Sequence, residues 1–209
     1  MPTAGLSMPN YQVILIKEAD MKKNILTIIF IFSAICLQAQ DLSWDIKFLK
    51  GRERESVSIS QIIRMETGEV FQINITPDSD AFCYVMAYDS GRNIYTLHNA
   101  PLTAGNEILI NQLQLTAPSG TETIYVIMSL ERLTRLENLI QTHQSNPNSR
   151  QHTDNLRREI INLQNTASRL GEPASSFIPS GGTTRSSAQE LVNRFSGVGL
   201  YVRTITIRH

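Results

Sequence analysis

The stretch AFCYVMAYDSGRNIYTL, residues 81–97, decides the fold class of this chain of 209 residues. Residues 81–88 are apolar at both odd and even positions, and successive side chains of a β-strand point to opposite faces. Both faces of this strand must therefore be covered, as in the centre of a layered domain. The polar residues 89–92 are typical of a tight turn, so residues 81–97 are predicted to form a β-hairpin.

Shorter runs with strand character surround this hairpin. Residues 124–128 are again apolar on both faces, and other runs alternate between apolar and polar residues. Turn signals such as the segment 77–80 separate them. Short strands at regular spacing favour a sandwich of two antiparallel sheets. The predicted strands, besides the hairpin, are 44–48, 71–75, 108–110, 113–115, 124–128 and 200–208, and residues 57–63 are predicted as a weaker strand or a turn of helix.

The pattern becomes helical in the second half of the chain. Apolar residues recur at steps of three and four over 130–140 and again over 156–170. The polar segment 144–151 separates these runs, so a hairpin of two helices is predicted, with Asp154 and Arg158 as an i,i+4 pair. We expect the apolar stripes to pack on the domain's own sheet. A surface for a partner protein is the alternative.

Two further features are predicted between this helical hairpin and the last strand. Residues 174–187 are rich in Ser, Gly and Thr and indicate a loop. Ser187, with Glu190 three residues later, forms a capping-box pattern, which predicts a short helix that ends near Phe195.

The expected fold class is α+β, mainly β: an antiparallel β-sandwich-like domain with a helical hairpin inserted before the last strand. Residues 40–209 form one β-rich domain, with a helical excursion at 130–196. The chain is 41% hydrophobic and 18% charged, with zero formal net charge. This composition is that of a globular protein. The charge balance argues against a nucleic-acid-binding protein, which would need clustered cations.

Residues 21–39 are typical of an export signal. Met-Lys-Lys-Asn opens the segment 21–39, an apolar run follows, and Ala39 offers a cleavage position. The apolar run is too short to span a membrane, and a buried core helix is the alternative interpretation. Residues 1–20 are interpreted as an upstream extension of the reading frame. The mature protein is expected in the periplasm or outer envelope, with a lipoprotein anchored through Cys36 as a second possibility.

Residues that could carry chemistry show no catalytic or metal-binding pattern. No serine has the flanking glycines of a nucleophile elbow, and the four histidines are not at metal-ligand spacing. No catalytic residue, metal or cofactor is therefore expected. Asp78, Asp80 and Asp89 are interpreted as turn residues rather than calcium ligands. His143 and His152 flank the helical-hairpin loop and are expected to be exposed.

A possible ligand surface is formed by Tyr84, Tyr88, Tyr95 and His98, whose aromatic rings could stack against a sugar or a peptide. Aromatic residues on strands more often pack in the core, and this interpretation is favoured for the tyrosines. Cys83 is the one cysteine after the export signal, so it cannot form an internal disulfide. We expect it to be buried as a small apolar residue.

Three stretches resemble domain of unknown function family 4384: GEVFQINITPDSDAFCYVMAYDSGRNIYTLHNAP, LTAGNEILI and TAPSGTETIYVIMS. The resemblance covers about residues 66–130 and consists of turn glycines and alternating apolar positions. It implies a small β-sandwich-like domain of bacterial exported proteins, and it implies no active residues. Asn99-Ala100-Pro101 and Ile110-Asn111 depart from the family's usual pattern.

The sequence therefore favours an exported, non-catalytic binding or assembly module of the bacterial cell envelope. Its expected partner is another envelope protein or peptidoglycan or another glycan, with no nucleic acid and no transmembrane helix in the mature chain. The alternative is a periplasmic hydrolase, or an accessory subunit of an envelope enzyme, whose site is assembled from residues far apart in sequence.

Overall fold

The structure, a computed structural model, describes residues 41–169, 174–180 and 190–209. The chain divides into Met1–Ala39 and Gln40–His209, and all described residues belong to the second unit. The predicted extension, export signal and Cys36 lie outside the described residues. Among the described helices, none combines the length and the apolar character that a bilayer crossing requires.

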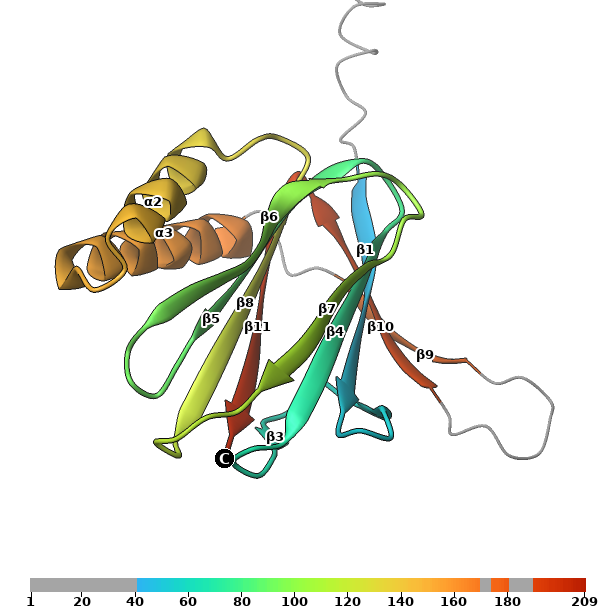
Figure 1. Ribbon diagram of the computed structural model, residues 1–209. Coiled ribbons are helices and arrows are strands. Elements are labelled where there is room, and N and C mark those ends of the chain that lie inside the picture. Colours follow the sequence, from blue (N-terminus) through green and yellow to red (C-terminus); the bar gives the residue numbers. More distant parts are fainter. Residues whose placement is uncertain (1–40, 170–173, 181–189) are drawn as a thin grey trace, which may run out of the picture. The chain divides into compact units, whose positions relative to one another are not determined.

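Two β-sheets form the body of the domain (Figure 1). The first sheet has the order β7-β4-β1-β10-β9, with β2 also paired to β1, and the second has the order β3-β11-β8-β5-β6. All pairings are antiparallel except that of β3 with β11. The strands are β1 (Asp41–Lys50), β2 (Glu55–Val57), β3 (Ile63–Arg64), β4 (Val70–Pro77), β5 (Ala81–Tyr88), β6 (Ile94–Leu102), β7 (Ile108–Gln114), β8 (Thr121–Ser129), β9 (Ala174–Ser180), β10 (Glu190–Val198) and β11 (Leu200–Arg208).

The main core lies between the two sheets. Trp44 of β1 is fully buried, and its ring centroid lies 5.1 Å from that of Phe195 on β10 and 5.3 Å from that of Tyr201 on β11. Since Tyr201 belongs to the second sheet, this aromatic cluster joins the two layers. The predicted fold class, mainly β and sandwich-like with two helices, is thereby confirmed.

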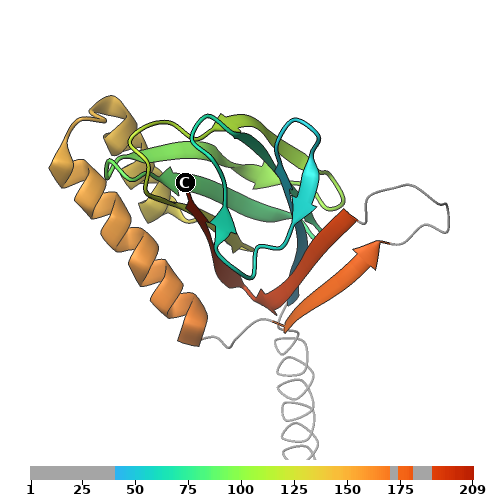
Figure 2. The ribbon, with the colours of Figure 1, turned by 90° about the horizontal axis from the view of Figure 1, so that it is seen from below.

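A second core lies on the other face of the second sheet, under the helices α2 (Thr134–Ser145) and α3 (Arg150–Arg169) (Figures 1 and 2). Along β5, Cys83 and Val85 belong to the sandwich core, whereas Tyr84 and Met86 belong to the core beneath the helices. This explains why β5 is apolar on both faces. The predicted packing of the helical hairpin on its own sheet and the burial of Cys83 are confirmed.

The segment after the helices differs from its prediction. Where the predicted helix is described, from residue 190 to Phe195, it is part of the strand β10, and residues 174–180 of the predicted loop form the strand β9. The rest of both predictions, residues 181–189, lies outside the described residues. Three strands therefore follow the helical hairpin, and the helical excursion does not extend to residue 196. The physical reason is tertiary: β10 pairs along β1, with Phe195 opposite Trp44, and this burial outweighs a local capping pattern.

A smaller difference concerns the end of the hairpin that is predicted to span residues 81–97. The strand β6 continues through Pro101 to Leu102. Proline is tolerated there because β6 is an edge strand, paired on one side only, so that its missing N–H removes no bond from the sheet interior.

Candidate functional site

The four residues predicted as a ligand surface do not lie together. Tyr84 is buried, with 1% of its surface exposed, beneath the helices. Its hydroxyl accepts a hydrogen bond from the backbone N–H of Leu133 (2.9 Å) and donates one to Glu137 Oε1 (3.1 Å). Burial raises the pKa of this hydroxyl to about 12, so it is a protonated donor at neutral pH. Tyr84 therefore connects β5 to the start of α2 and is a structural residue.

Tyr95 and His98 lie on the edge strand β6, opposite Ala87 and Val85, and thus on the sandwich side of the second sheet. Tyr95 is 52% exposed, and its hydroxyl donates to Asp89 Oδ2 (3.2 Å). His98 is half-buried, and burial lowers the pKa of its imidazole. Tyr88, by contrast, packs against the core on the helix side. The strand alternation thus divides the predicted surface between two faces.

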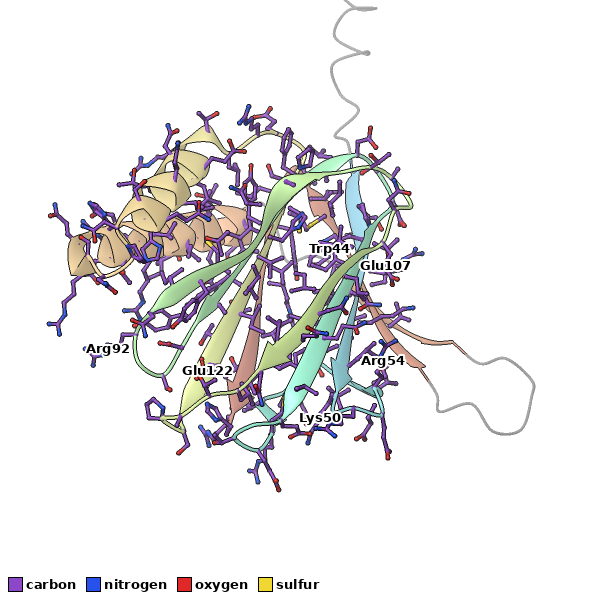
Figure 3. The ribbon with its side chains drawn as sticks, viewed as in Figure 1. Trp44, Lys50, Arg54, Arg92, Glu107 and Glu122 are labelled. Atoms are coloured by element: carbon purple, nitrogen blue, oxygen red, sulfur yellow. The ribbon has the colours of Figure 1, made fainter. Side chains whose placement is uncertain are left out.

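Tyr88 lines a cleft between the β5–β6 turn and the beginning of α3. The cleft has a volume of about 460 Å³, and three arginines contribute to its walls: Arg92 from the turn, and Arg150 and Arg157 from α3. Arg92 lies at the tip of the β5–β6 hairpin, next to the helical layer (Figure 3). The cleft's lining residues are Tyr88, Gly91, Arg92, Asn93, Pro147, Asn148, Arg150, Thr153, Asp154 and Arg157.

The position of Arg157 is set by two tyrosines. Its guanidinium carbon lies 4.9 Å from the centroid of the Tyr88 ring, a cation–π arrangement. Burial raises the pKa of the Tyr125 hydroxyl, and the charge of Arg157 opposes this increase. A planar guanidinium stacked on an aromatic ring keeps its N–H groups in one orientation. The Tyr88 ring therefore holds the positively charged Arg157 side chain in the cleft.

The cleft has an excess of positive charge. Asp154 is the one acidic residue among its lining residues, against the three arginines. Within the described part of the chain, Arg92 and Arg150 have no side-chain hydrogen bond or ion pair. Arg150 is also the first residue of the 20-residue helix α3, whose first turn contains no acidic residue. A cation at a helix N-terminus interacts unfavourably with the helix dipole.

Two of the aspartates interpreted as turn residues have structural partners. Asp78 accepts hydrogen bonds from Arg194 and Ser43, and Asp80 accepts one from the backbone N–H of Ala104. These contacts fit the predicted role of both aspartates in turns. Over the ranges that the structure describes, no group of three or more His, Cys, Asp or Glu side chains could hold a metal ion.

The helical hairpin differs from its prediction in three details. His143 is buried, with 4% of its surface exposed, because α2 turns this residue inward. His152 is half-buried rather than exposed. Arg158 donates to the side-chain oxygen of Asn155 (2.5 Å) instead of pairing with the Asp154 carboxylate.

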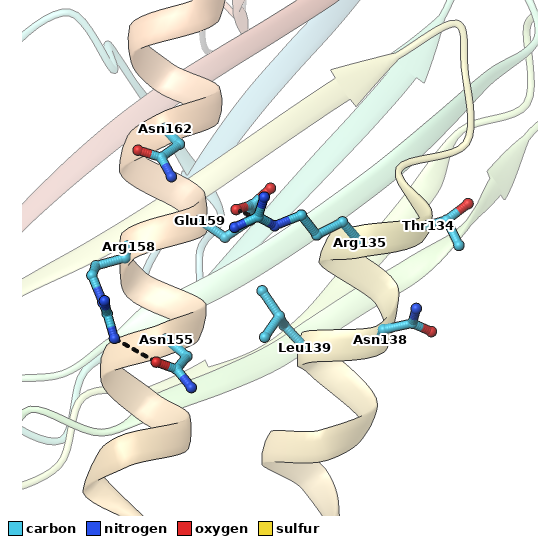
Figure 4. Close-up of a pocket in the computed structure, with 8 residues that line it drawn as sticks. All are labelled: Thr134, Arg135, Asn138, Leu139, Asn155, Arg158, Glu159 and Asn162. Atoms are coloured by element: carbon cyan, nitrogen blue, oxygen red, sulfur yellow. Dashed lines mark hydrogen bonds and ion pairs between the residues drawn. The ribbon is translucent and has the colours of Figure 1, made fainter.

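A second polar surface lies between α2 and α3 on the outside of the molecule (Figure 4). This open groove has a volume of about 680 Å³, and an ion pair between Arg135 and Glu159 (2.9 Å) bridges the two helices. Because its cations have partners of their own within the hairpin, the groove offers an anionic ligand less than the cleft of Tyr88 does.

The arginines of this cleft were not predicted from the sequence. Arg92 and Arg157 are 65 positions apart, and only the packing of α3 on the second sheet brings the β5–β6 turn to the helix. Tyr88 is the one member that the aromatic pattern had indicated. The chain matches no protein-family model, no curated protein and no solved structure.

Proposed function

We propose that this protein is an exported, non-catalytic binding module of the bacterial cell envelope, and that it binds an anionic ligand in the cleft of Tyr88, Arg92, Arg150 and Arg157. The observation that carries the proposal is the gathering of three arginines, one of them stacked on an aromatic ring, around a cleft with a single carboxylate. The export signal expected over residues 21–39 supports the compartment.

The chemistry of the cleft favours a carboxylate as the recognised group. A guanidinium presents a planar fork of N–H donors that matches a carboxylate or a phosphate in a bidentate arrangement. Peptidoglycan, one of the partners expected from the sequence, has carboxylates along its stem peptides. Of the expected partners, this polymer best complements a cleft that is both basic and lined by polar side chains such as Asn93, Asn148 and Thr153.

Co-sedimentation with purified peptidoglycan sacculi tests this function. The full chain is exported, purified and incubated with sacculi, and the bound fraction is measured over a range of protein concentrations. The double variant Arg92→Ala/Arg150→Ala should lower the affinity about tenfold. Both arginines are exposed, an exposed ion pair contributes up to about 1 kcal/mol, and a loss of about 1.4 kcal/mol is a tenfold change. Binding should also weaken with added salt, which screens exposed charges.

Arg52→Ala/Arg158→Ala is the matched control, since it also removes two exposed arginines, one from a turn and one from α3, and both lie outside the cleft. Equal binding by Arg92→Ala/Arg150→Ala and the wild type, or no binding by the wild type, would refute the proposal. Release of soluble muropeptides by the wild-type protein would support the hydrolase alternative instead.

A further inference from the structure

A second cavity opens on the other side of the β5–β6 hairpin, between the edges of the two sheets. The edge strands β6 and β7 lie on the same side of the sandwich and are not paired with each other, so the two layers diverge there (Figure 1). The cavity has a volume of about 340 Å³. Its lining residues are Phe71, Ala87, Asp89, Tyr95, Leu97, Leu113, Gln114, Leu115, Thr116, Glu122 and Ile124.

The floor of this cavity is part of the hydrophobic core. Phe71, Leu115 and Ile124 are almost fully buried members of the sandwich core, and Leu97 and Leu113 pack against them. A pocket of this size, apolar at its base and open to solvent, matches the usual sites for small ligands. An apolar group that entered it would leave water for contact with aliphatic and aromatic side chains.

The mouth of the cavity is acidic and aromatic. Glu122, at the start of β8, lines the cavity, and its Oε1 accepts hydrogen bonds from the backbone N–H of Ser90 (3.2 Å) and from His209 Nε2 (3.1 Å). Asp89 accepts the Tyr95 hydroxyl, and the Tyr95 ring is half exposed. No lysine or arginine is among the described residues that line the cavity.

These groups complement a cation rather than an anion. Two carboxylates near an exposed aromatic ring attract an ammonium group through charge and through the negative face of the ring. Burial and then these carboxylates raise the pKa of the Tyr95 hydroxyl, which is consistent with a negative potential at the mouth.

We propose that this cavity binds a small amphiphile with an apolar body and an ammonium head. The body would contact Phe71, Leu97 and Ile124, and the head would lie between Asp89, Glu122 and the Tyr95 ring. This site does not depend on the basic cleft, which lies on the other side of the β5–β6 hairpin and has the opposite charge.

Isothermal titration of the full chain with octylamine, octanoate and 1-octanol at neutral pH tests the site. These probes share one apolar body and differ in their head groups. We expect octylamine to bind about tenfold more tightly than octanoate, because charge complementarity selects between them. Glu122→Gln should reduce this preference, whereas Glu107→Gln, a carboxylate on the outer face of the first sheet, should leave it unchanged.

Leu97→Trp should block all three probes by filling the cavity, while a thermal melt reports whether this variant folds. If it does not fold, the Glu122→Gln comparison still decides the outcome. Equal affinity for octylamine and octanoate, or an unchanged preference in Glu122→Gln, would overturn the proposal. The variant Arg92→Ala/Arg150→Ala should bind octylamine normally, so failure of the basic cleft and failure of this cavity can be distinguished.

Discussion

Replacing Tyr84 by phenylalanine would remove one oxygen atom from the junction between β5 and α2. The ring would keep its volume and its place in the core beneath the helices, so no cavity should form. Two contacts would be lost: the hydrogen bond from the Leu133 backbone N–H and the one to the Glu137 carboxylate. The change therefore isolates the polar part of the attachment between the sheet and the helical hairpin.

The expected cost follows from the partners that remain. Glu137 keeps its ion pair with Arg132 (2.7 Å), so losing the hydrogen bond from Tyr84 should destabilise it only modestly. The N–H of Leu133, next to the first residue of α2, loses the acceptor that Tyr84 provides. A part-buried donor left unpaired costs about 1–3 kcal/mol, and a typical hydrogen bond contributes about 0.5–1.5 kcal/mol. We expect the free energy of unfolding to fall by about 2 kcal/mol.

Urea unfolding, followed by the fluorescence of Trp44, the one tryptophan of the chain, measures this change. The slope of free energy against urea should stay constant while the midpoint falls. Tyr95→Phe is the matched control: it also removes a hydroxyl that bonds to a carboxylate, but at a half-exposed site, so its effect should stay within about 0.5 kcal/mol. Equal midpoints for the two variants would refute the reasoning.

Three further changes follow from the same structure. Leu156→Ala, at a fully buried position of α3, should lower the free energy of unfolding by about 2–5 kcal/mol, and an unchanged urea midpoint would show that α3 is not docked. The thiol of Cys83, whose pKa burial raises, should react with a thiol reagent only in urea; rapid reaction in the native state would contradict the sandwich core. Burial and then the charge of His152 lower the pKa of His143, so the unfolded chain binds the proton more readily and stability should fall as the pH drops below about 6.5. In thermal melts between pH 7 and pH 5, His143→Gln should reduce this loss of stability. If the variant kept the full wild-type pH dependence, another group would be responsible, for example His98, whose pKa burial also lowers.

The parts of the fold that the sequence predicts are those specified by local periodicity. Residues 81–88 and 124–128 are apolar on both faces because each strand separates two cores, and this is visible as an unbroken apolar run. The apolar residues of α2 and α3 recur with the helical period because one face of each helix packs against the second sheet. In each case the burial pattern repeats along the element itself, so no distant contact is needed to recognise it.

The error between residues 187 and 195 has the opposite origin. The spacing of Ser187 and Glu190 is a local signal for a helix start, whereas the strand depends on pairing with β1, about 150 positions earlier in the chain. The burial of Phe195 against Trp44 supplies a stabilisation that a short helix could not. Single-sequence patterns cannot weigh such a contact, because it exists only once the whole sheet has formed.

The charges around the candidate site could not be predicted from the sequence either, because their positions depend on the tertiary fold. A formal net charge of zero argues against a uniformly basic or acidic protein, but it says nothing about local separation of charge. The β5–β6 hairpin separates a basic cleft on its helix side from an acidic cavity on its sandwich side. Its turn contributes to both: Asp89 lines the acidic cavity and accepts the Asn93 backbone N–H (2.7 Å), while Arg92 lines the basic cleft.

The helical hairpin provides two of the three arginines of the basic cleft. Arg150 and Arg157 both belong to α3, and without α3 the Tyr88 ring would lack the cation that stacks on it. The acidic cavity, in contrast, is lined by strands of the two sheets and their connecting segments, as far as the structure describes the chain. Loss of α3 docking should therefore abolish the binding of anions while the sandwich still binds the ammonium amphiphile. Measuring both kinds of binding would thus distinguish what the sandwich contributes to ligand binding from what the helical hairpin contributes.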